Sequence, residues 1–360
     1  MPDVYLSHRH LGEIRQRVEA GAQPWADAHA RLVAAADEAM QQEPLHVRMN
    51  GGSPYFRVDG VYLNNQDGVH DPDADTEGRK LAGRTSDASW TLALAYQLTG
   101  NTAYADHALT LIHTWCINQN TRMFPTGRVQ DAATPGGAYG GDVVMFASFR
   151  KLFLAAYLLD DYGGWDLRSR AGVVRWIKAM LDPQRELMYF NGREMYNNWE
   201  DERLLYLACG ALAIRDLDLL RYTFDRFVHT LPMKMTDEGE LHRETMRTRS
   251  MSYTLMSLHG SLALAEIARA YGVDLYDVNI NGRTLKLAAD YAAAGLLDMA
   301  SWPHKMIRPL GDEFVKGGSR MSVFELAHRQ WGEPRYMQII EQHGGRPVTA
   351  DHATLLYAER

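Results

Sequence analysis

Along most of the chain, apolar residues recur every three or four positions, the spacing that places them on one face of an α-helix. In many of these segments the apolar face is wide, which is expected for helices covered on more than one side. The predicted helical ranges are 8–41, 86–98, 102–117, 142–161, 165–181, 199–214, 217–231, 254–271, 282–297, 321–331 and 334–342. The sequence therefore predicts an all-α protein.

Two long segments, 45–85 and 118–141, interrupt this pattern, and a shorter one precedes Asn198. The long segments are rich in glycine and proline and show little periodicity. Irregular segments of this length are usually either functional or disordered, and the aromatic residues Tyr55 and Tyr62 in the first argue against disorder. We expect both long segments to help form a cleft.

Three predicted helices are each followed by a glycine turn and a second helix, and the glycines are Gly100, Gly272 and Gly332. One such hairpin cannot bury its apolar face alone, so several hairpins must stack. Stacked hairpins form either an open solenoid or a closed α/α-toroid, and the long loops favour the toroid. We therefore predict one catalytic domain over residues 1–360, an incomplete barrel of helical hairpins whose long loops form a cleft.

The composition narrows the possible partners. The net charge is −7 and the isoelectric point is about 6.1, which gives no general affinity for nucleic acid. No signal peptide is visible in the given chain and no run of roughly 18 apolar residues occurs, so we expect a soluble protein without a membrane partner, cytoplasmic, or secreted or periplasmic if a signal was trimmed. Cys116 and Cys209 lie in apolar helical runs and are expected to be buried free thiols. Oligomeric state and compartment stay open.

The segment 243–253 concentrates Arg243, Arg247 and Arg249 with Tyr253 just ahead of a long predicted helix. A helix start flanked by arginine is suited to a carboxylate or a phosphate. Positive charge beside a tyrosine also favours loss of the phenolic proton. The same residues could equally be surface arginines in a loop and a tyrosine of the core.

A second candidate segment is Asn197, Asn198 and Trp199. Asn198 is a good helix N-cap, which is a purely structural interpretation. In the functional interpretation, the amide N–H groups hydrogen-bond a substrate carboxyl group and the tryptophan stacks on a sugar ring.

Glu200, Asp201 and Glu202 follow directly. A glycoside hydrolase typically uses two carboxylates as its catalytic groups. Consecutive residues point in different directions on a helix, so these three do not form an obvious pair. A cluster of acids at a helix start is the better interpretation.

Residues 246–253 and 272–276 resemble the central motifs of the alginate-lyase-like polysaccharide lyases. Other segments resemble that family in the same order, and they are 55–60, 91–100, 121–125 with Gln130, and 302–307. Each motif is weak alone, but together they span about residues 50–310 and are fairly specific.

This resemblance implies an α/α-toroid that cleaves a 1,4-linked uronate polymer, such as alginate or glucuronan, by β-elimination without a metal or other cofactor. In that reaction, donors neutralise the uronate carboxylate and a base then removes the C5 proton. By position, Tyr253 is implied to be the base and the acid, with Arg247 and Asn198 as neutralising groups. The implied contacts to the acidic polysaccharide are Asn197, Trp199, Arg249, Gln130, Trp302 and His304.

The sequence departs from the family at Trp199, where the family usually has histidine after two asparagines. Three histidines could take its place: His304, His242 and His70. Otherwise Asn198 and Arg247 suffice, or the reaction is no longer an elimination. A glycoside hydrolase on the same scaffold and a non-catalytic sugar-binding protein therefore stay as alternatives.

Overall fold

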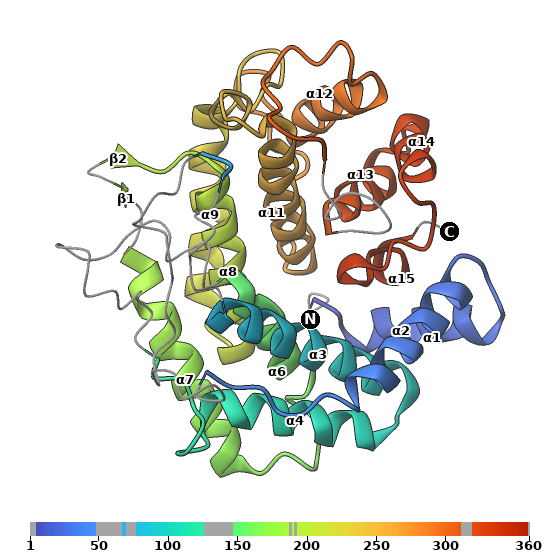
Figure 1. The fold of residues 1–360 in the computed structure, drawn as a ribbon, viewed down its shortest axis with the longest axis vertical. Helices are drawn as coiled ribbons and strands as arrows, with labels where there is room; N and C mark the ends of the chain where they lie inside the picture. The colour runs from blue at the N-terminus through green and yellow to red at the C-terminus, as the bar shows by residue number, and fades with distance from the viewer. Residues whose placement is uncertain are drawn as a thin grey trace. The chain divides into compact units, whose positions relative to one another are not determined.

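The computed structural model describes residues 5–47, 67–69, 77–125, 147–186, 189–190, 193–310 and 319–358 (Figure 1). Within these ranges, no helix is long and apolar enough to cross a membrane. The chain divides into two compact units. Unit 1 comprises Met1–Val33, Tyr196–Leu204 and Tyr222–Arg360, and unit 2 comprises Ala34–Met195 and Leu205–Arg221. The prediction of one catalytic domain over residues 1–360 stays a prediction.

Helices make up nearly all the regular structure of the described residues. The α-helices are α1 (His8–Glu19), α2 (Trp25–Ala39), α3 (Glu77–Thr99), α4 (Thr102–Cys116), α6 (Arg150–Leu158), α7 (Leu167–Glu186), α8 (Asn198–Ile214), α9 (Leu217–Lys234), α10 (His242–Thr245), α11 (Ser250–Ala270), α12 (Leu285–Leu297), α13 (Ser322–Trp331), α14 (Pro334–Gln342) and α15 (Ala353–Tyr357). Short 3-10 turns are η1 (Ala147–Phe149), η2 (Ser319–Met321) and η3 (Ala350–His352). Strands β1 (Tyr189–Phe190) and β2 (Arg193–Glu194) pair antiparallel.

In unit 2, helix α3 packs against α4 and α6, and α4 packs against α7 (Figure 1). The side chains of Trp115, Phe149 and Phe153 are fully buried there. The indole N–H of Trp115 donates a hydrogen bond of 3.0 Å to Thr85 Oγ1 on α3, so this buried polar atom is paired. Gly100 adopts a positive φ of 74° between α3 and α4, a conformation that glycine reaches without strain.

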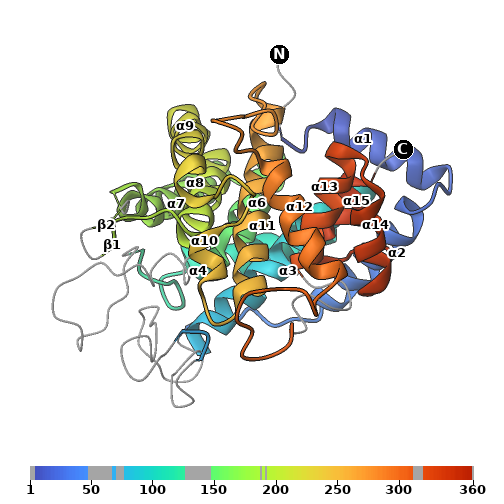
Figure 2. The same cartoon turned by 90° about the horizontal axis from the view of Figure 1, so that it is seen from above.

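In unit 1, helix α11 packs against α10, α12 and α13, and α13 packs against α14 and α15 (Figure 2). The α13–α14 turn uses Gly332 at a φ of 65°, and Pro334 starts α14. The hydroxyl groups of Tyr5 and Tyr357 lie 2.7 Å apart and join the two ends of the chain. Unit 1 contains the described candidate site residues, and α11 is their main support.

The predicted helices are mostly confirmed, with shifts at several helix starts. Helix α3 begins at Glu77, so residues 77–85, expected to be irregular, are helical. Leu81 and Ala82 are buried in this first part of α3, and burial stabilises a segment whose local pattern is weak. Helix α11 begins at Ser250, ahead of the predicted start at residue 254, so Tyr253 lies in its first turn. The short elements β1, β2, α10 and α15 were not predicted.

Of the three predicted glycine-turn hairpins, those at Gly100 and Gly332 are confirmed. The prediction of a short turn at Gly272 is wrong, because the connection between α11 and α12 comprises residues 271–284. Tyr276 in that connection is buried against α11 and anchors the longer path. Both cysteines are buried and neither forms a disulfide, as predicted. The predictions for residues 55–60, His70 and Gln130 concern positions outside the described residues.

Candidate active site

The first half of the site is the chain between α10 and α11. The guanidinium carbon of Arg247 lies 3.8 Å from the centroid of the Tyr253 ring. Arg249 precedes α11, and the backbone N–H of Tyr253 donates to its carbonyl oxygen at 3.1 Å. A cation this close to the ring is attracted to its π face and favours the phenolate over the phenol. The structure thus brings together Arg247 and Tyr253, which the sequence placed six positions apart.

The second half is the start of α8, where Asn198 is 1% exposed. Its backbone N–H donates to Glu244 Oε1 at 2.7 Å, and its Nδ2 donates to Met256 Sδ on α11 at 2.9 Å. Among the described residues, the side-chain oxygens of Asn197 and Asn198 are buried without a hydrogen-bond partner. These oxygens can accept a hydrogen bond, and Asn198 Nδ2 has a second N–H that can donate to a polar ligand. Trp199 follows in α8 and is partly buried.

A third segment, residues 302–307, lies alongside the start of α11. The backbone N–H of Ser250 donates to Lys305 O at 3.2 Å, and the N–H of Ile307 donates to Thr248 O at 3.0 Å. The indole N–H of Trp302 donates to Ser250 Oγ at 2.8 Å. Trp302 and Arg249 are therefore fixed to the same short stretch of backbone as Tyr253.

Trp302 packs tightly on α12, where a Cβ atom at Gly295 would lie 2.2 Å from the indole ring. Glycine is required there because any larger residue would displace the tryptophan. His304 stacks edge-on against Trp302, with ring centroids 4.8 Å apart, and its Nε2 is 2.8 Å from Tyr291 Oη. His304 is thereby held beside Trp302 in the same segment.

Three histidines were candidates to replace the one missing at Trp199, and the structure describes the surroundings of two of them, His304 and His242. His304 Nε2, which contacts Tyr291 Oη, also lies 3.7 Å from Glu240 Oε1, so one ring nitrogen faces both groups. Burial and the neighbouring Arg243 lower the pKa of His242 below its ordinary value. His70 and Gln130 lie outside the described residues.

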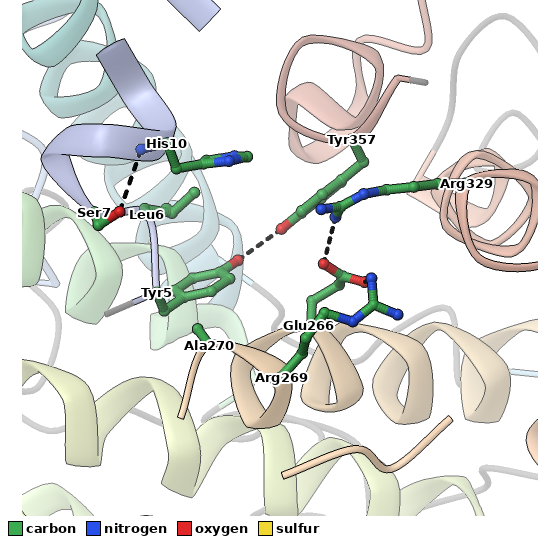
Figure 3. Close-up of a pocket in the computed structure, with 9 residues that line it drawn as sticks. All are labelled: Tyr5, Leu6, Ser7, His10, Glu266, Arg269, Ala270, Arg329 and Tyr357. Atoms are coloured by element: carbon green, nitrogen blue, oxygen red, sulfur yellow. Dashed lines mark hydrogen bonds and ion pairs between the residues drawn. The ribbon is translucent and has the colours of Figure 1, made fainter. Parts of the chain in front are cut away.

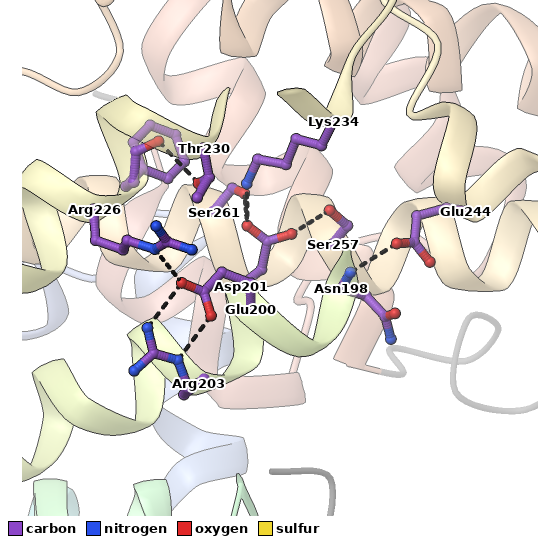
Figure 4. A network of polar contacts seen from close by, with 11 residues as sticks. Asn198, Glu200, Asp201, Arg203, Arg226, Thr230, Lys234, Glu244, Ser257 and Ser261 are labelled. Atoms are coloured by element: carbon purple, nitrogen blue, oxygen red, sulfur yellow. Dashed lines mark hydrogen bonds and ion pairs between the residues drawn. The ribbon is translucent and has the colours of Figure 1, made fainter. Parts of the chain in front are cut away.

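The acidic cluster of α8 is a buried ionic network (Figure 4). Glu200 is fully buried and accepts hydrogen bonds from Arg203 Nε at 2.7 Å and Arg226 Nε at 2.8 Å. Removing a carboxylate from such a network would leave buried charge without a partner. Glu200 is therefore bound within the protein and does not provide the exposed acid of a hydrolase.

Asp201 points the other way, as the helical geometry predicts, and pairs with Lys234, Ser257 and Ser261 (Figure 4). Two of these partners lie on α11, and a Cβ at Gly260 of that helix would lie 3.0 Å from Asp201 Cβ. The small residue permits the two helices to approach closely. Asp201 thus joins the start of α8 to α11 and supports the backbone that carries Asn198.

Sequence reasoning missed Glu244, whose side chain is 1% exposed. Its Oε2 lies 4.0 Å from Arg247 Nη1, and its Oε1 binds the start of α8. Burial raises the pKa of Glu244 to about 8, while the backbone N–H of Asn198 and the charge of Arg247 act in the opposite direction. The only signal in the sequence was its position three residues before Arg247, which is also typical of a surface ion pair.

A cavity of about 190 Å³ opens at the other end of α11 (Figure 3). Its walls include Tyr5, Tyr357 and two arginines, Arg269 and Arg329. Both arginines pair with the buried carboxylate of Glu266. Glu266 holds both arginines within the protein, and Tyr253, Arg247 and Asn198 do not line this cavity, so the start of α11 is the candidate site.

Comparisons with known proteins bear on the fold and the family of the chain. A family model described as alginate lyase matches residues 19–302. An alginate lyase from Bacteroides ovatus has a TM-score of 0.83 at 22% identity, with 100% of both chains covered. A variant of alginate lyase A1-III complexed with a tetrasaccharide has a TM-score of 0.72 at 18% identity, covering 97% of this chain and 94% of that chain.

Alginate lyase A1-III from Sphingomonas species A1 has a TM-score of 0.66 at 18% identity, covering 97% of this chain and 95% of that chain. No curated protein matches the sequence. The likeness to these solved structures confirms the predicted fold class, an all-α α/α-toroid. The protein is a polysaccharide lyase. It belongs to the alginate lyase family, whose model covers well over half of its length.

Proposed function

We propose that this lyase cleaves a 1,4-linked uronate polymer by β-elimination, with Tyr253 as both base and acid. The observation that carries the proposal is the position of Arg247, whose guanidinium carbon lies 3.8 Å from the centre of the Tyr253 ring. A tyrosine ordinarily has a pKa of about 10 and is a poor base at neutral pH. Adjacent positive charge favours the phenolate and so makes proton abstraction feasible.

The chemistry explains why both halves of the site are needed. The C5 proton of a uronate is weakly acidic while the neighbouring carboxylate carries its full charge. Hydrogen bonds from Asn198 and charge from Arg247 would stabilise the negative charge that develops on this carboxylate as the proton leaves. Asn197 lies beside Asn198 in sequence and is assigned to the same carboxylate.

The elimination balances within the site. The Tyr253 phenolate takes the C5 proton, and the C5–H electron pair becomes the second bond between C4 and C5. The bond between C4 and O4 breaks, and the same tyrosine returns the proton to O4. The base is thus regenerated, and the new chain end carries an unsaturated uronate.

The remaining site residues are assigned to substrate binding. Trp302 and His304 lie along the start of α11 with Arg249, where aromatic faces and a cation suit an acidic sugar chain. Trp199 and Gln130 are assigned to further sugar contacts. The uronate is mannuronate, as in alginate, or glucuronate, as in glucuronan. Both present the same geometry at C4 and C5, and a related lyase has been crystallised with a tetrasaccharide.

Incubation of the protein with polymannuronate, alginate and glucuronan tests this function. The lyase reaction is followed by the ultraviolet absorbance of the unsaturated uronate, in parallel with an assay for new reducing ends. We expect both signals to rise together on at least one polymer. New reducing ends without absorbance would indicate hydrolysis, and polymer binding with neither signal would indicate a non-catalytic protein.

A further inference from the structure

Glu244 connects the two segments that carry the proposed active site, and Figure 4 shows its hydrogen bond to Asn198. It lies in the short helix α10, and its Oε1 accepts the backbone N–H of Asn198 at 2.7 Å. The first N–H groups of a helix have no partner within the helix, so an acceptor from elsewhere must satisfy them when they are buried. Glu244 supplies this acceptor at the start of α8.

The other carboxyl oxygen faces the second segment. Glu244 Oε2 lies 4.0 Å from Arg247 Nη1, and it makes no hydrogen bond among the described residues. Arg247 in turn lies over the Tyr253 ring. One buried carboxyl group therefore spans from the backbone of Asn198 to the arginine that covers the proposed base.

The protonation state of Glu244 suits this position. Burial raises its pKa to about 8, and Asp201 adds to the rise. Three groups favour the charged form and so limit the rise of the pKa: the backbone N–H of Asn198 and the positive charges of Arg247 and Lys234. Below that pH a neutral carboxyl group accepts the N–H without cancelling the positive charge of Arg247. That charge stays available to the tyrosine and to a bound carboxylate.

We infer that Glu244 is a positioning residue of the lyase site, which holds Asn198 and the stacked pair of Arg247 and Tyr253 in one arrangement. This inference rests on the function proposed above. With 1% of its side chain exposed, Glu244 acts through its neighbours and does not itself touch the polymer. The residues implied by the family resemblance were all expected to act on or contact the polymer, whereas Glu244 acts only through other residues.

Three variants at this position test the inference. Glu244→Gln retains the acceptor and mimics the neutral acid, so we expect kcat at pH 7 to stay within about threefold of the wild-type value. Glu244→Met preserves volume but removes the acceptor, and we expect kcat to fall about 100-fold with KM nearly unchanged. Glu244→Asp shortens the side chain and should resemble the methionine variant. The matched control is Glu238→Gln, at an exposed position nearby in sequence.

A second measurement does not depend on activity. The Nε–H resonance of Arg247, assigned with Arg247→Lys, is displaced by the ring current of Tyr253 while the two side chains are stacked. We expect this displacement in the wild type, Glu238→Gln and Glu244→Gln, and its loss in Glu244→Asp and Glu244→Met. If the wild type cleaves no polymer, the proposed function fails, whereas the resonance still tests the position of Arg247.

The inference is overturned if folded Glu244→Met keeps both the wild-type kcat and the displaced resonance. The inference is equally overturned if the Arg247 resonance is no longer displaced in Glu244→Gln, because the glutamine still accepts the hydrogen bond from Asn198. Should the methionine variant fail to fold, Glu244→Asp decides the question. If the Arg247 resonance of Glu244→Asp is displaced as in the wild type, the inference is contradicted. If the displacement is lost, the inference is supported.

Discussion

The two ends of α11 carry the same three residue types in different arrangements. At the N-terminal end, Arg247 lies over Tyr253, and Glu244 is close to the arginine. At the C-terminal end, the Arg269 guanidinium lies 4.5 Å from the centre of the Tyr276 ring, with Glu266 beside both. Only the first end carries the residues of the proposed chemistry, so the residue types alone do not make a site.

The difference lies in what each carboxylate binds. Tyr276 donates its hydroxyl proton to Glu266 Oε1 at 2.8 Å, and Arg269 and Arg329 pair with the same carboxylate. Burial, together with the charge of Glu266, raises the pKa of Tyr276 well above its ordinary value. This phenol is kept protonated and serves the fold.

At the other end, Glu244 is used differently. Its Oε1 binds a backbone N–H at the start of α8, and its pKa of about 8 leaves it neutral at pH 7. In the proposed mechanism, the charge of Arg247 is then available to Tyr253 and to a bound carboxylate. The same three residue types thus hold the fold together at one end of α11 and are assigned to the proposed reaction at the other.

The largest expected effect is the difference in kcat between the variants Tyr253→Phe and Tyr276→Phe. Tyr253→Phe should lower kcat by about 10⁴-fold while polymer binding persists, because the base and acid are removed together. Tyr276→Phe should leave kcat within about twofold, since that phenol takes no part in the reaction. Initial rates of product absorbance measure both. An active Tyr253→Phe enzyme would remove Tyr253 from the mechanism.

The two arginines provide the next comparison. Arg247→Met should lower kcat/KM by about 10³-fold, because charge that stabilises the reacting carboxylate and the phenolate is lost. Arg269→Met should change kcat/KM by no more than about twofold, since Arg269 pairs with Glu266 and lies at the far end of α11. Steady-state kinetics on the same polymer decide between them. Equal losses would mean that Arg269 also serves the reaction.

The pH dependence of stability sharpens the assignment of Glu244. Its pKa rises from an ordinary 4.5 to about 8 on folding, so between these values the native state holds one more proton than the unfolded chain. The free energy of unfolding should therefore fall as the pH rises, by about 4 kcal/mol across this window. Urea unfolding at a series of pH values measures it. Glu244→Gln should flatten the dependence, and an unchanged slope would contradict the buried neutral acid.

The smallest effect concerns the structural end of α11. Tyr276→Phe removes one buried hydrogen bond to Glu266, whose carboxylate keeps both arginines. We expect the free energy of unfolding to fall by about 1 kcal/mol. Urea unfolding of the variant and the wild type at one pH is the measurement. A much larger loss would mean that the phenol is essential to the pairing of the arginines.

Local patterns in the sequence were enough for the all-α class, most of the helices and the residues at the start of α11. Apolar periodicity reflects contacts between residues three or four positions apart, and glycine turns reflect a backbone requirement at one residue. Tyr253 and Arg247 could be found together because the resemblance gave roles to residues already close in sequence. The start of α11 itself was misplaced, since burial of Ser250 and Met251 extends the helix.

Only the tertiary structure decided which charged residues are buried and what they bind. Glu200 reaches Arg226 on α9, Asp201 reaches Ser257 on α11, and Glu244 reaches the backbone of Asn198. These partners are 26 to 56 positions apart, and no periodic pattern connects them. Burial depends on how separate helices pack, and it sets both the pKa of Glu244 and the pairing of Glu200. For that physical reason the sequence identified the candidate tyrosine, whereas packing decided which acids support it.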